Sequence, residues 1–215
     1  GLALRLGGRA QTTLPILQTP RGSIQDSARI FDWLEKNHAP LALIPAEVRT
    51  DVRSVEQRFN AIGKDVARLL YAGSFGKADL YIVKLWTDHA TPWQGLMIRT
   101  FYPAIRWAFK RKLNISEASA QKARTRIGAQ LDWLEAQIAG GHTYLVGNTF
   151  TAADITAAAL LAPLACPAEH PVYGQPQFQA EMAGAIADWH DRPALQWVRQ
   201  IYRQHRGQLN GGAAF

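Results

Sequence analysis

An apolar stripe over residues 48–69 constrains the fold of this chain more than any other feature. Its members recur at alternating steps of four and three residues: Val48, Val52, Val55, Phe59, Ile62, Val66 and Leu69. Side chains at this spacing share one face of an α-helix, which has about 3.6 residues per turn. The stripe therefore predicts one long helix that packs on one side, either in the core of its own domain or against a second copy of the chain.

The remainder of the chain after residue 45 also has helical periodicity and no strand pattern. Further helices are expected within residues 78–112, over Glu117–Ile138, from Thr151 to about Ala162, over about Gln179–His190 and over Pro193–Arg206. Pro92 and Pro103 should break or kink the first of these, and Pro163 should kink or end the third, because proline lacks an amide hydrogen. The proline-rich stretch Ala165–Phe178 is expected to form a loop.

The segment before residue 39 has a different pattern. Residues 13–18 suit a short strand, Thr19–Ser23 has the composition of a turn, and Ile24 suits a brief second strand. An amphipathic helix then follows, which Asp26 or Ser27 could cap. The sequence therefore predicts a hairpin and a helix ahead of the helical part.

The most specific local motif is Phe150-Thr-Ala-Ala-Asp-Ile155. The hydroxyl of Thr151 can accept a hydrogen bond from the amide of Asp154, and the carboxylate of Asp154 can accept one from the amide of Thr151. This reciprocal arrangement is a capping box, and Phe150 and Ile155 are placed for a hydrophobic staple. A structural role is favoured for Asp154, and its removal is expected to cost about 1–2 kcal/mol of stability.

Cysteine, histidine and hydropathy limit the classes of function. Cys166 is the single cysteine, which excludes an internal disulfide and a multi-cysteine metal site, and it is expected to be a buried core residue. The six histidines have no metal-binding spacing, so no metal is expected. No apolar run approaches the roughly 20 residues that span a bilayer, and no secretory leader is expected. We therefore expect a cytoplasmic protein with no membrane partner.

The formal net charge of +7 is unevenly distributed. No acid occurs between Asp88 and Glu117, where Arg99, Arg106 and the run Lys110–Lys112 lie. Arg99 and Arg106 could face an anionic substrate, whereas a solvated basic face is favoured for the run. Nucleic-acid binding is not favoured, since neither a helix-turn-helix nor an aromatic-basic sheet pattern is found.

Three motifs in order resemble the helical domain of the cytosolic glutathione transferases. Leu131-Asp-Trp-Leu-Glu135 precedes Tyr144-Leu-Val-Gly147, and the motif at 150–155 follows. Residues 14–35 are similar to the second half of the family's thioredoxin-like lobe, and Pro193–Trp197 is similar to its final helix. The resemblance implies an α+β two-domain fold, in which a partial thioredoxin-like N-terminal lobe precedes an all-α glutathione-transferase C-terminal helical domain.

The resemblance also implies domain limits. Residues 1–38 would form the partial lobe, 39–46 a linker, 47–206 the helical domain and 207–215 a tail. The chain starts at Gly1 without methionine, in a strand-like run. The catalytic Tyr, Ser or Cys of the family is therefore expected upstream, and no catalytic residue is named.

Four residues match the glutathione-binding positions of the family. Leu14 and Pro15 match the cis-proline pair that meets the cysteinyl backbone, and Asp26 and Ser27 match the acid-serine pair that meets the γ-glutamyl end. Two structural alternatives remain open: an ordinary trans proline at a strand start, and a plain helix cap at Asp26 and Ser27.

The family binds its electrophile between the lobes, against the first long helices of the helical domain. Tyr71, Phe101, Tyr102 and Arg106 are the candidates for this pocket. The alternative is that these aromatic residues, with Trp93 and Trp107, form core or interface.

The resemblance implies two functions. The first is a glutathione transferase-like enzyme, with glutathione as co-substrate, in which the thiolate attacks a small hydrophobic electrophile or glutathione reduces it. The alternative is a non-catalytic binding or scaffold protein of the same fold. A homodimer is expected in either case.

Overall fold

The computed structural model describes residues 15–38 and 43–206. At the N-terminal side, strands β1 (Ile16–Thr19) and β2 (Gly22–Gln25) pair antiparallel, with Ile16 opposite Gln25. Helix α2 (Ser27–Asn37) follows directly. The hairpin and the helix expected from the sequence are confirmed here. Leu14, the rest of residues 1–14, residues 39–42 and the tail 207–215 lie outside the described residues.

The remaining elements are all helical: η1 (Ala46–Val48), α3 (Arg49–Ser74), α4 (Asp79–Thr87), α5 (Pro92–Lys112), α6 (Glu117–Ala139), α7 (Ala152–Ala165), α8 (Pro176–Ile186), η2 (Ala187–Trp189) and α9 (Pro193–His205). The prolines account for the main differences from expectation, and Pro103 lies inside α5 without ending it. Pro163 lies inside α7, which ends only where Cys166 adopts a left-handed conformation with φ of 50°. Helix α8 begins at Pro176, within the stretch expected to be a loop, because proline is well tolerated at the first helical position.

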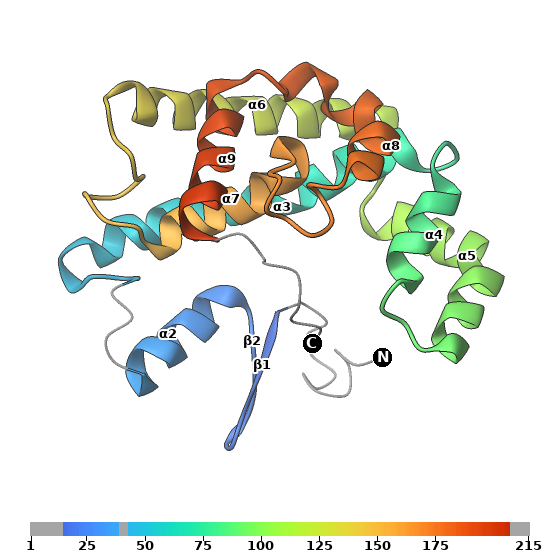
Figure 1. The fold of residues 1–215 in the computed structure, drawn as a ribbon, viewed down its shortest axis with the longest axis horizontal. Helices are drawn as coiled ribbons and strands as arrows, with labels where there is room; N and C mark the ends of the chain where they lie inside the picture. The colour runs from blue at the N-terminus through green and yellow to red at the C-terminus, as the bar shows by residue number, and fades with distance from the viewer. Residues whose placement is uncertain (1–14, 39–42, 207–215) are drawn as a thin grey trace.

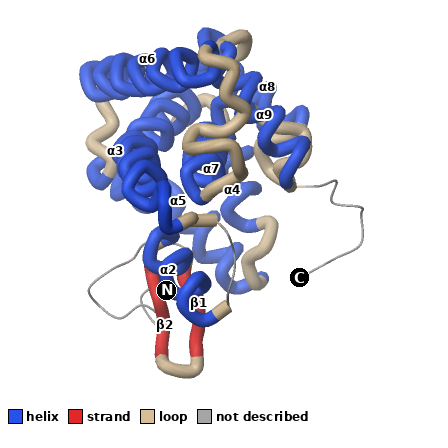
Figure 2. Tube along the Cα trace, turned by 90° about the vertical axis from the view of Figure 1, so that its left-hand side faces the viewer, coloured by secondary structure: helices blue, strands red, loops and turns tan. Residues whose placement is uncertain are grey.

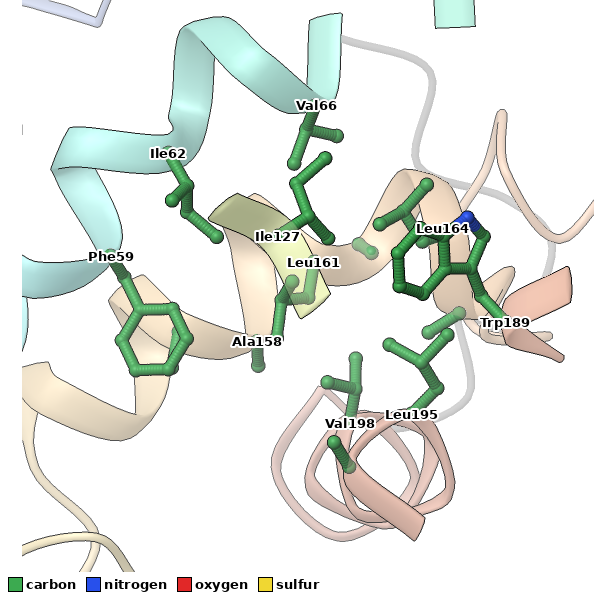
Figure 3. Close-up of a cluster of buried hydrophobic side chains, with 14 of the residues drawn as sticks. Phe59, Ile62, Val66, Ile127, Ala158, Leu161, Leu164, Trp189, Leu195 and Val198 are labelled. Carbon is green, nitrogen blue, oxygen red and sulfur yellow. The ribbon is translucent and has the colours of Figure 1, made fainter. Parts of the chain in front are cut away.

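Helix α7 lies at the centre of the helical part (Figure 1). It packs against α3 on one side and α9 on the other, and α3 also contacts α6 and α8. Figure 3 shows side chains from these helices converging around Ala158 and Leu161, which are at most 2% exposed. From Val52 onward, the stripe of α3 is buried in this core. The stripe is therefore the core face of its own domain rather than a free surface.

The capping box opens α7 as expected. The carboxylate of Asp154 accepts hydrogen bonds from the backbone amide of Thr151 at 2.8 Å and from its hydroxyl at 3.1 Å. It also accepts one from the backbone amide of Leu145 at 2.8 Å, which lies in the preceding loop. Burial raises the pKa of Asp154, while these hydrogen bonds oppose the rise. One carboxylate thus holds both the helix start and the loop before it.

Helix α2 is joined to α3 by ion pairs. Arg53 of α3 pairs with Asp32 of α2 and, at 2.6 Å, with the buried carboxylate of Glu56. Arg49 pairs with Glu35 of α2 at 3.2 Å. Figure 2 shows α2 and the hairpin gathered on one side of the helical part.

Helices α4 and α5 lie side by side at one end of the helical part (Figure 1). The hydroxyl of Tyr102 donates to Asp79 at 2.6 Å, and Arg106 pairs with the same carboxylate. Burial and this hydrogen bond raise the pKa of Tyr102. Within the described residues, every helix is too short or too polar to cross a membrane.

Candidate functional site

A cavity of about 360 Å³ opens between the C-terminal half of α3, helix α4, the end of α7 and the loop that leads into α8. Its lining consists of Gly63, Val66, Ala67, Leu70, Tyr71 and Ser74 of α3; Ile82, Leu85 and Trp86 of α4; Ala159, Leu160 and Pro163 of α7; Val172 and Tyr173 of the loop; and Phe178 and Met182 of α8. No charged side chain is among them. A small uncharged molecule with an apolar body suits such a lining.

Two tyrosines supply polar groups at the cavity. The ring of Tyr71 stacks on Phe75 at 4.8 Å between centroids and meets Trp86 edge-on at 6.3 Å. Burial raises the pKa of Tyr71 and likewise that of Tyr173. Both phenols therefore keep their protons at neutral pH and can donate hydrogen bonds to a bound molecule.

Ser74 is the one cavity-lining side chain of the described residues that is buried with an unpaired polar atom. The residue is 1% exposed, and its Oγ has no hydrogen-bond partner in the protein. Leaving a buried hydroxyl unpaired costs about 1–3 kcal/mol, so such groups are uncommon in folded proteins. A polar group of a ligand that reached Oγ from the cavity would give this hydroxyl a partner.

Replacing Ser74 with alanine is expected to raise the free energy of unfolding by about 1 kcal/mol in the ligand-free protein, because the unpaired hydroxyl disappears. Urea denaturation measures the change. Ser119→Ala is the matched control, since Ser119 lies within the capping box of α6 and hydrogen-bonds there. It should lower stability. A loss of stability in Ser74→Ala would show that the hydroxyl is paired in solution.

The loop that covers the cavity is organised by His170. Its Nδ1 accepts hydrogen bonds from the backbone amides of Val172 at 3.1 Å and Tyr173 at 3.0 Å, and its ring stacks on that of Tyr173. Gly174 closes the loop, because a Cβ there would lie 2.7 Å from the carbonyl oxygens of Pro167 and Ala168. Burial and then the charge of Arg206 lower the pKa of His170 to about 4.

This loop should loosen in acid. Nδ1 can accept the two amide hydrogens only while it is unprotonated, and an unfolded histidine protonates near pH 6.5. The folded chain therefore binds fewer protons than the unfolded chain between about pH 6.5 and 4, and stability falls as pH falls through that range. NMR titration of the His170 ring should give a midpoint about 4, and His170→Asn should flatten the pH dependence. A midpoint near 6.5 would contradict the assignment.

An open groove of about 270 Å³ adjoins the cavity. Ala159 lines both, and the groove continues between α7 and α9 past Phe150, Tyr202, His205 and Arg206. The ring of His205 stacks on Phe150 with centroids 3.8 Å apart. The cavity and the groove together offer an apolar site with a polar, cationic end.

The four residues expected at the electrophile pocket occupy different environments. Tyr71 lines the cavity, whereas Tyr102 lies behind Trp86, with their rings 5.8 Å apart. Arg106 is held by Asp79, and Phe101 is 50% exposed on the outer side of α5. The lining of the cavity includes none of these last three.

Of the residues expected to bind glutathione, Leu14 lies outside the described residues and Pro15 is exposed. Asp26 is the N-cap of α2, where its Oδ1 accepts a hydrogen bond from the amide of Ala28 at 3.0 Å. Its φ of 84° is rare for a residue other than glycine, and such strain concentrates at binding sites. Ser27 begins the helix beside it.

The sequence reasoning missed Ser74, Trp86, Tyr173 and His170. Ser74 lies one residue past Gly73, where the apolar stripe of α3 fades, and the other three belong to segments whose packing partners are far along the chain. The sequence signal that could have pointed to Ser74 is a polar residue at the end of the apolar stripe of α3. No local pattern distinguishes the others from ordinary core or loop residues.

The described side chains include neither a cluster of metal ligands nor a thiol with a lowered pKa. Among them, no three His, Cys, Asp or Glu residues lie close enough together to hold a metal ion. Cys166 is half-buried rather than fully buried, and its thiol contacts the carbonyl oxygen of Pro163 at 3.6 Å. Burial raises its pKa to about 11, so the thiol stays protonated and is a poor nucleophile at neutral pH.

Comparison with known families identifies part of the chain. Residues 117–192 match the family model described as "Glutathione S-transferase, C-terminal domain", which covers α6 to η2. No curated protein and no solved structure matches the chain. The match supports a glutathione-transferase-like protein with a C-terminal helical domain of that type.

Proposed function

We propose that this protein binds glutathione and transfers it to a small hydrophobic electrophile held in the α3–α4 cavity. The observation that carries the proposal is the cavity itself: an uncharged, largely aromatic and aliphatic lining beside a helical region that matches the glutathione-transferase C-terminal domain. The volume of about 360 Å³ falls in the range of small-molecule sites.

The start of α2 is the proposed site for the γ-glutamyl end of glutathione. That end carries a carboxylate and an ammonium group. Backbone amides and the dipole at a helix N-terminus attract the carboxylate, beside Ser27, while the carboxylate of Asp26 attracts the ammonium. Pro15 and Leu14 are proposed to meet the cysteinyl backbone.

The chemical step is a nucleophilic substitution or addition. The thiol loses its proton and the sulfur electron pair forms a carbon–sulfur bond. In a substitution a leaving group departs with its bonding electrons, and in an addition the displaced π electrons take up a proton. The thiolate rather than the thiol is the nucleophile, so a donor must stabilise it. No described residue is assigned that role. A homodimer in the cytoplasm remains part of the proposal.

Binding and turnover are measured separately. Calorimetry with glutathione should show binding that Ser27→Ala weakens at least tenfold, the loss of one charge-assisted hydrogen bond. Ser54→Ala, on the exposed side of α3, is the matched control and should bind normally. Turnover with 1-chloro-2,4-dinitrobenzene should release chloride and form the thioether.

Two outcomes separate the functional alternatives. Binding without turnover would favour the non-catalytic binding protein of the same fold. Absence of glutathione binding would overturn the glutathione-dependent enzyme and leave the scaffold protein as the alternative.

A further inference from the structure

Helix α5 carries apolar side chains on two opposite faces. The inner face carries Ile98, Tyr102, Ile105 and Phe109, and the rings of Tyr102 and Phe109 pack against Trp86 of α4. A helix that is apolar on all sides is normally enclosed by protein or lipid. Here α5 lies at the end of the molecule, with α4 as its main neighbour among the described elements (Figure 1).

The outer face of α5 is formed by five large apolar residues. Trp93 is 68% exposed and Trp107 is 62% exposed, and Leu96, Met97 and Phe101 lie exposed between them. Their positions fall within one broad stripe of the helix, on the side opposite Tyr102. Scattered exposed apolar residues are ordinary, whereas an aligned set of this size marks an interaction surface.

Cations flank this apolar face along α5, a helix that contains no acid. Arg99, Lys110, Arg111 and Lys112 are exposed, and none of them forms an ion pair with an acid of the described residues. The guanidinium of Arg111 lies over the ring of Trp107, 5.0 Å from its centroid. Arg106, in contrast, is taken up by Asp79. The outer face of α5 therefore combines tryptophans, aliphatic side chains and unpaired positive charge.

We propose that the outer face of α5 docks on the surface of a membrane that contains anionic lipid headgroups. Helices that lie in the membrane interface present Trp, Phe and Leu to the acyl chains and Lys and Arg to the headgroups. Tryptophan favours this depth because its ring is apolar and its N–H is polar. Long cationic side chains extend back to the headgroups while their stems cover apolar surface.

The charge pattern argues against a second copy of the chain and against a nucleic acid as the partner of this face. A second copy of the chain docked through α5 would bring the cations of both copies together with no acid between Asp88 and Glu117 to offset them. A nucleic acid would be met by cations at the centre of the surface, whereas here the centre is apolar. An anionic membrane satisfies the apolar centre and the cationic rim together.

Surface docking needs no spanning segment. The expectation of no membrane partner rests on the absence of a long apolar run, which excludes insertion across the bilayer and not adsorption to its surface. The proposal is independent of glutathione chemistry, because none of the outer-face residues lines the cavity or the groove.

Vesicle co-sedimentation tests the proposal with phosphatidylcholine vesicles that contain or lack phosphatidylserine. The protein should bind the anionic vesicles, and the emission of its tryptophans should shift to the blue. Binding should weaken with added salt, since surface charges are screened within about 8–10 Å. Replacing Lys110, Arg111 and Lys112 together by Gln should weaken binding on the order of 100-fold, because each cation near an anionic surface contributes roughly fivefold.

Two further variants sharpen the result. Lys64→Gln/Lys122→Gln/Arg203→Gln removes the same charge from exposed positions on other helices and should bind nearly as well as the parent protein. Trp93→Ser/Trp107→Ser should abolish the fluorescence shift while circular dichroism stays unchanged, since both side chains are exposed.

The proposal would be overturned if the protein did not bind anionic vesicles, or if the two charge variants lost binding equally. It would also be overturned if α5 mediated dimerisation, measured by analytical ultracentrifugation, or RNA binding, measured by a filter-binding assay, without vesicle binding.

Discussion

Replacing Asp154 with alanine is expected to lower the free energy of unfolding by about 3 kcal/mol, a large part of the stability of an ordinary domain. The carboxylate is 0% exposed and accepts hydrogen bonds from the amides of Thr151 and Leu145. Its removal leaves two buried amide hydrogens unpaired and detaches the loop from the start of α7. Chemical denaturation followed by circular dichroism measures the loss.

The predicted loss exceeds the 1–2 kcal/mol of an ordinary helix cap because Leu145 belongs to a different segment. Asp51→Ala is the matched control, since Asp51 also lies in the first turn of a helix but is exposed. Its loss should stay below about 1 kcal/mol, as for a screened interaction with the helix dipole. Equal losses of stability in the two variants would show that Asp154 acts only through its interaction with the helix dipole.

Filling the cavity should abolish the binding of apolar groups there. S-hexylglutathione carries an apolar tail on the glutathione sulfur, and each buried methylene contributes about 0.8 kcal/mol, so partial burial should raise affinity about 100-fold over glutathione. Ala67→Trp places an indole in the cavity from α3. In this variant the advantage of the hexyl tail should shrink to about threefold, while glutathione itself still binds.

Ala61→Trp, on the exposed face of the same helix, is the matched control for this experiment. It should retain the full advantage of the tail, and both variants should keep the parent's circular dichroism. If Ala67→Trp also retains the advantage, the hexyl tail binds elsewhere and the assignment of the cavity fails. If glutathione does not bind the parent protein at all, the proposed function fails instead, so the two failures are distinguishable.

Local patterns predicted the helices because each depends on residues close together in sequence. The stripe beginning at Val48 predicted α3 from its spacing alone, and the 150–155 motif predicted the capping box at the start of α7. Boundaries were less predictable where two rules compete. Pro176 occurs in a proline-rich stretch that suggested a loop, yet it begins α8, since proline both interrupts a helix and suits its first position.

The candidate site depended on contacts between distant segments. Tyr71 could be proposed from its place on the first long helix, but its neighbours could not, because Trp86 and Tyr173 reach the same cavity from α4 and the loop before α8. Likewise, Phe101 and Tyr102 are adjacent in sequence, but one faces outward and the other packs against Trp86. Adjacent helical residues point about 100° apart, and only packing decides which of them is enclosed.

By itself, the sequence determined the order of the elements, the apolar face of α3 and the capped start of α7, because spacing and capping act over a few residues. Only the tertiary structure decided that the α3 stripe serves the core of its own domain, that Ser74 is left without a partner beside a cavity, and that the aromatic residues of α5 divide between two faces. The physical reason is that burial depends on all the neighbours of a side chain. Most of those neighbours come from segments that are far away in the sequence.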